Sequence, residues 1–273
     1  MPQNYLGIHG VVGLVVAVGD HGKILHCQGD RYAPTQVESH TTANLYAVSV
    51  VSERCAYAVG DHGAVLHWNG ERWNTVMMGD KEDELFAVWS CPGSATLIGG
   101  RHVLLAQSEH MTAADTLLHT TTFVIGIWGS GPRDIWFLCR RRLVYHWNGT
   151  ACTAHQLPGE QDDEYCAIGG SGPNDLVWVV GVGGAMVFGD GETWETLDSG
   201  TDATLLGVCA AGSDDVWVTT NSGQLRHWDG RGWEVAAFSP FGYLTGVCIV
   251  DGVVWCAGAQ GVVLQHRPGA CGA

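Results

Sequence analysis

The chain is poor in charge, and above all in positive charge. Only 15% of its 273 residues are Asp, Glu, Lys or Arg, and just two are lysines. Because 13 basic side chains face 28 acidic ones, the formal net charge is −15. A protein that binds nucleic acid or an anionic membrane needs a broad basic surface. We therefore expect neither a nucleic-acid nor a membrane partner.

The sequence also lacks a long apolar run. No apolar stretch approaches the roughly 18 residues that a membrane-spanning helix needs. Residues 11–19 (VVGLVVAVG) have the composition of a secretory signal core, but no Lys or Arg precedes them. Their second half continues as VAVGDHG from Val16, which matches YAVGDHG from Tyr57 and so belongs to a folded repeat. We therefore expect a cytoplasmic protein.

Several motifs that specify chemistry are missing. The ten cysteines form no Cys-x-x-Cys pair, and most lie in strand-like runs such as LLGVC. This pattern favours reduced, buried thiols over disulfides. There is also no GxSxG elbow, HExxH helix, P-loop, Rossmann fingerprint or EF-hand loop. A non-catalytic function is favoured, and the sequence leaves enzyme activity open.

A repeat of about 40 residues organises the whole chain. Successive copies are 40, 40, 39, 41, 40 and 39 residues apart. In each copy the third residue is Gly or Ala and the fourth is Val or Ile. The copies are YLGI from Tyr5, LYAV from Leu45, LFAV from Leu85, VIGI from Val124, YCAI from Tyr165, LLGV from Leu205 and LTGV from Leu244.

Each copy reads as four short strands. After the inner strand come a second strand such as DIWFL, a third containing LHW, and an Asn-Gly or Asp-Gly hairpin into a fourth strand. Four strands per copy predict a single domain over residues 1–273, an all-β, seven-bladed β-propeller with blades starting near 5, 45, 85, 124, 165, 205 and 244.

Two copies depart from the pattern. Residues 102–123 lack the hairpin signature, so we expect the outer part of the third blade to be irregular. The seventh copy shows only three strands, which predicts a short or open last blade. An open strand edge can pair with another chain, so the protein is expected to be a monomer or an edge-paired dimer.

The blade motifs carry a family resemblance. The segments GSGPRDIW, GSGPNDLVW and GSDDVW, with HWNGERW, resemble bacterial propellers with BNR or Asp-box-like repeats, related to the photosystem II assembly-factor type. The Asp-box of sialidases has one residue between Asp and Gly, whereas Asp190 and Gly191 are adjacent here. The resemblance therefore implies a scaffold and not a glycosidase.

Most aromatic and histidine side chains follow the repeat and need no functional explanation. All 12 tryptophans fall at repeat positions, where packing between blades is favoured. Five histidines share one predicted third-strand position, and identical positions around a ring diverge instead of converging on a metal. These histidines are His26, His67, His146, His227 and His266.

The position after the Val/Ile column varies freely and is therefore a candidate site. On the first, sixth and seventh copies it holds His9, Cys209 and Cys248, a possible Zn or Cu ligand set near the axis. On the third and fourth copies it holds Trp89 and Trp128, which are expected either to pack or to form a platform for a sugar or planar ligand. The leading expectation is that no cofactor is bound.

The turns between second and third strands form another candidate site. They carry His21, His62, Arg101, His102 and the run Arg140 to Arg142. Arginine forks suit carboxylates and phosphates, so these turns predict a site for an anionic ligand or an acidic partner. Acidic residues in the flanking loops make this face polarised, which suits protein recognition: Asp80, Glu82, Asp83, Glu84, Asp162, Asp163 and Glu164.

Three functions follow from these patterns. The leading hypothesis is a binding or scaffolding propeller that recognises a protein or anionic ligand through its loop face. The alternative is a small-molecule enzyme or ligand binder, lyase-like or metal-dependent, that uses the axial pocket. A third is a carbohydrate-binding lectin with equivalent sites between blades.

Overall fold

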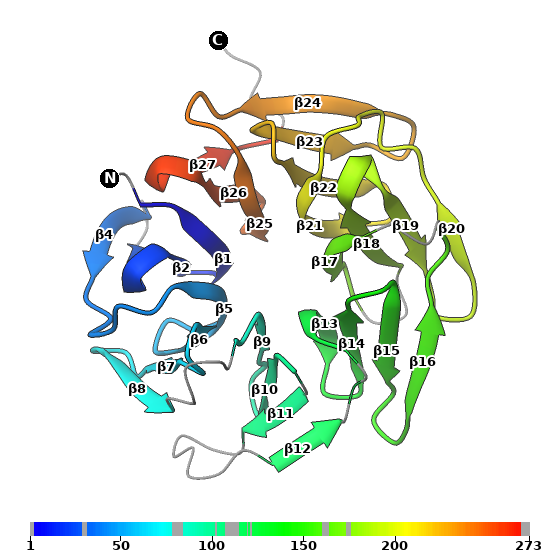
Figure 1. Cartoon of the computed structure of the whole chain (residues 1–273). Coiled ribbons are helices and arrows are strands. Elements are labelled where there is room, and N and C mark those ends of the chain that lie inside the picture. Colours follow the sequence, from blue (N-terminus) through cyan, green and yellow to red (C-terminus); the bar gives the residue numbers. More distant parts are fainter. Residues whose placement is uncertain are drawn as a thin grey trace.

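The computed structural model describes residues 3–28, 32–77, 84–101, 103–106, 115–118, 120, 122–159, 164–172 and 176–268. Within these residues, antiparallel sheets stand around a central axis like the blades of a propeller (Figure 1). Each sheet is built from one continuous stretch of sequence, and its strands follow one another from the axis outward.

The strands of the first three sheets are β1 (Tyr5–Val11), β2 (Leu14–Gly19), β3 (Ile24–Gln28) and β4 (Ala33–Val37); β5 (Leu45–Ser52), β6 (Cys55–Gly60), β7 (Val65–Trp68) and β8 (Trp73–Met77); and β9 (Ala87–Trp89), β10 (Thr96–Gly99), β11 (Val103–Ala106) and β12 (Asp115–Leu118). The next two sheets contain β13 (Val124–Gly131), β14 (Asp134–Cys139), β15 (Leu143–Trp147) and β16 (Cys152–Gln156); and β17 (Tyr165–Gly170), β18 (Val177–Gly181), β19 (Met186–Gly189) and β20 (Trp194–Thr196). The last two contain β21 (Leu205–Gly212), β22 (Asp215–Thr220), β23 (Gln224–Trp228) and β24 (Trp233–Phe238); and β25 (Leu244–Val250), β26 (Val253–Gly258) and β27 (Val263–His266).

The predicted number of blades is wrong. Six sheets are complete four-stranded blades, and the last repeat forms only the three-stranded sheet β25–β27. In the second, fourth, fifth and sixth sheets the third strand reaches the fourth through a short hairpin, such as Asn69 to Arg72. After β27 the chain instead reads Arg267-Pro268, and proline cannot donate to a strand ladder. A propeller with six blades therefore replaces the seven-bladed prediction.

The third blade also differs from its prediction. Its outer part was expected to be irregular, but β11 and β12 pair in antiparallel fashion, with Val103 opposite Leu118 and Leu105 opposite Asp115. The ladder contains one register shift between Val103 and Leu104. A strand can therefore form without the Asn-Gly hairpin signature when a neighbouring strand offers a free edge.

The inner strands crowd together around the axis, and this explains the Gly/Ala column. A Cβ on Gly7 would lie 2.7 Å from the carbonyl oxygen of Tyr46 on the next inner strand. One on Gly126 would lie 2.9 Å from Cγ2 of Ile168. The third position must therefore stay small wherever two sheets approach most closely.

The ring closes by packing between its two ends. Tyr5, Val15 and Trp255 share one buried apolar cluster that joins the first sheet to the sheet β25–β27. Thr245 Oγ1 donates a hydrogen bond to the carbonyl oxygen of Tyr5 at 3.0 Å. In the described residues no strand is exchanged between the ends, so side-chain packing stabilises the closure.

The Asp-x-Trp motif and its histidine form a repeated structural triad. In the fourth sheet, Asp134 Oδ1 accepts from Trp136 Nε1 at 3.0 Å and lies 2.9 Å from His146 Nε2, and the two rings stack with centroids 3.8 Å apart. Asp215 joins Trp217 and His227 in the same way, with centroids 4.1 Å apart. These residues therefore organise the blades.

One member of the predicted histidine column is misplaced. His26, His67, His146 and His227 share one register, with His26 opposite Val16 and His146 opposite Trp136. In the sheet β25–β27 this register belongs to Gln265, which faces Trp255. His266 lies one residue further on, because this third strand is shifted by one position relative to the sequence alignment.

Candidate functional site

A repeated β-bulge opens the inner strands at one end of the axis. In six sheets the pairing register shifts between the first and third residues of the repeat motif, as between Leu45 and Ala47. The intervening residue is left out of the ladder, and a bulge re-aims its side chain. These second-position residues, with Phe86, form what we call the rim of an axial cavity: Leu6, Tyr46, Phe86, Ile125, Cys166, Leu206 and Thr245.

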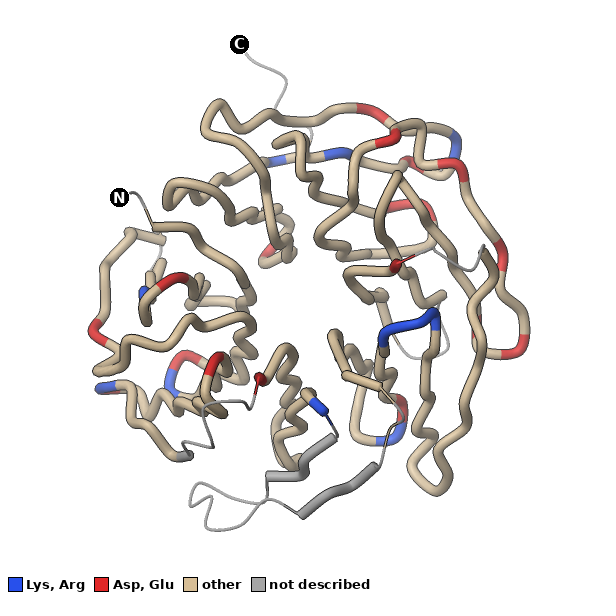
Figure 2. The backbone as a smooth tube through the Cα atoms, in the orientation of Figure 1, with Lys and Arg blue, Asp and Glu red and all other residues tan. Residues whose placement is uncertain are grey.

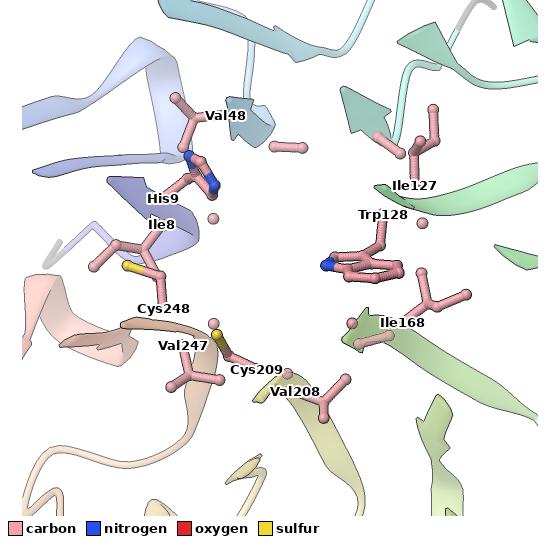
Figure 3. Close-up of a pocket in the computed structure, with 18 of the residues that line it drawn as sticks. Ile8, His9, Val48, Ile127, Trp128, Ile168, Val208, Cys209, Val247 and Cys248 are labelled. Atoms are coloured by element: carbon pink, nitrogen blue, oxygen red, sulfur yellow. The ribbon is translucent and has the colours of Figure 1, made fainter. Parts of the chain in front are cut away.

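Below the rim lies an axial cavity of about 340 Å³. Its wall is made by the inner strands alone (Figure 3). None of the described residues that line it is Asp, Glu, Lys or Arg. The lining includes His9, Cys209, Cys248, Trp89 and Trp128, so the variable column proposed from the sequence does face the axis.

The predicted metal ligands lie in this cavity but do not form a metal site. In the described part of the chain, no three His, Cys, Asp and Glu side chains are grouped so that they could hold a metal. His9 Nδ1 instead accepts a hydrogen bond from the backbone N–H of Val50 at 3.0 Å. Burial raises the pKa of Cys209 to about 11 and that of Cys248 well above its usual value, so both remain thiols. The geometry gives the metal hypothesis no support.

The side chains of Trp89 and Trp128 each contact the next sheet around the ring. Trp89 Nε1 donates to the carbonyl oxygen of Gly129 at 3.2 Å. A Cβ on Gly170 would lie 2.7 Å from Cη2 of Trp128, so the indole occupies space that only a glycine leaves free. Each ring therefore packs against a neighbouring blade and also lines the cavity.

The rim is surrounded by the turns between second and third strands, which we call the turn face. In six of these turns the first residue donates its backbone N–H to the carbonyl oxygen of the residue that precedes an inner strand or its repeat motif, as Asp61 does to Asn44 at 2.9 Å. Arg140 does the same to Phe123 at 3.0 Å. The turns are thereby fixed beside the start of the inner strands.

The three consecutive arginines of the turn face have three different surroundings. The guanidinium of Arg140 lies 5.5 Å from the ring centroid of Phe123 and 6.0 Å from that of Phe86, which is cation–π distance. Arg142 Nη1 donates to the carbonyl oxygens of Leu157 and Gly159 at 3.1 and 2.6 Å. Arg141 is exposed. The run of arginines is the long blue stretch of backbone between β14 and β15 (Figure 2). The three side chains therefore do not act as one cluster.

Sequence reasoning missed the aromatic part of this site. Tyr46 and Phe86 stack with centroids 5.7 Å apart, and Phe86 meets Phe123 edge to face at 5.9 Å. The Tyr46 hydroxyl donates to Asp61 Oδ1. We call Tyr46, Phe86, Phe123 and Arg140 the aromatic–arginine cluster. The signal that could have revealed part of it is the second position of the repeat, which is aromatic in two consecutive copies, at Tyr46 and Phe86.

The structure describes only some of the other predicted site residues. Arg101 is exposed, and its carbonyl oxygen accepts from Thr120 Oγ1 at 3.0 Å. Glu84 forms an isolated bridge with Asp61, and the backbone carbonyl of Glu164 accepts from Val182. The following predicted residues lie outside the described residues: Asp80, Glu82, Asp83, His102, Asp162 and Asp163.

Comparison with known proteins supports the fold. No family model and no curated protein matches the sequence. Among solved structures, YCF48 from Cyanidioschyzon merolae is similar at 14% identity and a TM-score of 0.77, covering 98% of this chain and 96% of its own. A structure of YCF48 bound to D1 peptide is similar at 14% identity and a TM-score of 0.76, covering 97% and 94%.

A third similar structure is a catalytically inactive virginiamycin B lyase from Staphylococcus aureus with quinupristin. Its TM-score is 0.82 at 13% identity, over 97% of this chain and 94% of its own. Identities this low show a common β-propeller fold and no more. The neighbours include a photosystem II assembly factor, but nothing at the level of sequence supports the BNR or Asp-box resemblance. Within the described residues, no helix has the length and apolarity required to span a membrane.

Proposed function

We propose that the protein is a binding or scaffolding propeller whose turn face holds an extended segment of a protein partner. The observation that carries this proposal is the aromatic–arginine cluster beside the rim. Phe86 and Phe123 present partly exposed rings, and the cation of Arg140 lies against both. Aromatic side chains and arginine are enriched in protein–protein interfaces relative to the rest of the protein surface.

Arg141 adds positive charge to this face, and histidines occupy two of the equivalent turn tips. His21, His62 and Arg141 occupy tips with left-handed backbone, at φ 54°, 58° and 63°. The corresponding tips across the ring are Gly183 and Gln260, which carry no charge. On a chain of net charge −15, the run of arginines from Arg140 to Arg142 in one turn favours a partner segment that carries carboxylates.

The fold itself is known to accept peptides. A protein of similar structure, YCF48, has been solved with a D1 peptide bound. We infer the same general use here, an extended peptide at the mouth of the propeller. The chemistry of this chain favours alternating apolar and acidic side chains, because Leu6, Ile125 and Leu206 belong to the rim and the run of arginines lies in one turn beside it.

Reversing the charge of Arg141 tests this proposal. The Arg141→Glu variant should weaken binding of a fluorescein-labelled (Glu-Leu)₄ peptide by about tenfold, since one attraction is lost and one repulsion is gained. Fluorescence anisotropy titrations measure this. Arg141 is a better target than Arg140 or Arg142, which also support Phe86 and the backbone at Leu157.

Arg231 provides the matched control. It is equally exposed, but it lies in the hairpin between β23 and β24, at the opposite end of the strands from the turn face. The Arg231→Glu variant should bind the peptide as the unmodified protein does. Equal weakening by both variants, or tighter binding of a (Lys-Leu)₄ peptide, would show that the turn face does not select acidic segments.

A further inference from the structure

We propose that the axial cavity is a second binding site, for a small neutral ligand whose carbonyl-type acceptors take hydrogen bonds from His9 and Trp128. The cavity shares Tyr46 and Phe86 with the aromatic–arginine cluster, but its proposed donors are other residues, so the site does not depend on the partner proposed for the turn face. Its volume of about 340 Å³ falls at the lower end of the range of pockets that hold small molecules.

The first argument is charge. The described lining contains no Asp, Glu, Lys or Arg. Burial lowers the pKa of His9 to about 4 and raises the pKa of Cys209 to about 11, so both side chains are neutral at physiological pH. An ion that entered this cavity would lose its hydration and meet no opposite charge. The cavity therefore selects uncharged molecules.

The second argument is the tautomer of His9. Its Nδ1 accepts the backbone N–H of Val50, so the neutral ring carries its proton on Nε2. No described residue accepts a hydrogen bond from this Nε2–H. The ring lies in the cavity between Val48 and Cys248 (Figure 3). His9 thus supplies a donor whose direction is set by the protein and whose acceptor must come from a ligand or solvent.

The third argument is the orientation of Trp128. Its ring faces His9 from the other side of the cavity, and the edge that carries its nitrogen is turned toward the centre (Figure 3). No acceptor for the indole N–H occurs among the described residues, whereas the indole of Trp89 is satisfied by Gly129. Contact with Gly170 fixes the ring.

Two preorganised donors therefore face each other across a cavity whose described lining carries no charged side chain. Ile127, Ile168 and Val208 belong to that lining. Neither donor is fully buried, so solvent satisfies both in the free protein, and a ligand with carbonyl oxygens or unprotonated ring nitrogens replaces that solvent. A bicyclic lactone, amide or ketone has the size, neutrality and acceptors that this arrangement requires.

The test compares neutral fragments with an anionic counterpart that keeps the same bicyclic ring. Coumarin, a neutral bicyclic lactone, serves as reference probe beside a set of small neutral lactones, amides and ketones, and coumarin-3-carboxylate is its anionic counterpart. In ¹H–¹⁵N spectra of the full chain, neutral fragments should shift one indole resonance among those of the 12 tryptophans, the one missing from the Trp128→Phe variant.

Two variants separate the binding role of Trp128 from packing. Trp128→Phe keeps a ring against Gly170 but removes the N–H, and it should weaken coumarin binding by about three- to tenfold, the effect of one hydrogen bond. Trp89→Phe removes an N–H that already has a protein acceptor, so affinity should change by less than about twofold.

The proposal is overturned by any of three results. The first is that no neutral fragment shifts the Trp128 indole. The second is that coumarin-3-carboxylate binds as tightly as coumarin. The third is that Trp89→Phe and Trp128→Phe weaken binding equally, which would reduce both residues to a packing role.

Discussion

Replacement of Gly60 by alanine is expected to lower the free energy of unfolding by about 3 kcal/mol or more, because the new methyl group has no space. Gly60 ends β6, and its Cβ would come closer than 3.0 Å to the carbonyl oxygen of Asn44 and the Cα of Leu45. Both are backbone atoms, which cannot rotate away. The same carbonyl oxygen accepts from Asp61, so a shift would also disturb that hydrogen bond.

The close approach recurs around the ring, which is why the effect should be large. Gly19, Gly181 and Gly258 end their second strands in the same way, each facing a carbonyl oxygen of the residue before an inner strand. For a domain of this size, 3 kcal/mol corresponds to a fall in Tm of roughly 6 to 12 °C. Urea unfolding followed by tryptophan fluorescence gives the free energy directly.

Gly232 supplies the control for this prediction. No atom lies within 4 Å of the position that a Cβ on Gly232 would take, and its φ is not in the left-handed region. Gly232→Ala should therefore change the free energy of unfolding by less than about 0.5 kcal/mol. If Gly60→Ala is as mild as Gly232→Ala, the close packing of second strands against inner strands is incorrectly described.

Acidification from pH 6.5 to pH 4 should destabilise the folded ring, with His26 as a main cause. His26 is 1% exposed, and its Nε2 accepts a hydrogen bond from Trp73 Nε1 of the next blade at 3.0 Å. Burial lowers the pKa of His26 from 6.5 to about 4. The unfolded chain therefore binds a proton at a higher pH than the folded chain does.

The direction of the pH effect follows from that difference. Between pH 6.5 and pH 4, His26 is protonated in the unfolded state but remains neutral in the folded state. The free energy of unfolding therefore falls as the pH falls, and it levels off below about pH 4. The full shift corresponds to about 3 kcal/mol for His26. His9, whose pKa burial also lowers to about 4, changes stability in the same direction.

His26→Gln isolates the contribution of His26. Glutamine offers Trp73 an oxygen acceptor but takes up no proton in this range. Urea titrations at pH 7 and pH 4.5 should show a smaller loss of stability for His26→Gln than for the unmodified protein, by about 2 kcal/mol. Identical losses would mean that His26 is protonated in the folded state.

The repeat made the fold class and the inner strands predictable, but not the completeness of every blade. Inner and second strands are recognisable because packing against both neighbours restricts their residues, as at Gly7 and Gly126. Outer strands have one free edge and tolerate more sequences. For that reason the number of complete blades and the pairing of β11 with β12 were not predicted correctly, whereas the three strands read in the last repeat do form the sheet β25–β27.

The candidate sites were likewise predictable from the sequence only in part. The sequence correctly placed His9, Cys209 and Trp128 beside the axis. They occupy the same position of the repeat, so they lie at the same height along the axis, and alternation along a strand sets which way their side chains point. Sequence could not tell that the backbone of Val50 uses His9 Nδ1, since that contact depends on the distance between sheets. Nor could it tell that Arg142 binds the backbone while Arg141 faces solvent, because the left-handed turn decides where each side chain points.

The central claim is that the turn face contacts a protein partner, and site-specific cross-linking in the native host tests it most directly. A photoreactive benzoylphenylalanine in place of Arg141 should yield a covalent adduct with one polypeptide, cross-linked through a single extended segment rich in acidic residues. The same residue in place of Arg231, at the opposite end of the strands, should yield no such adduct. Adducts formed equally at both positions, or only at position 231, would contradict the account.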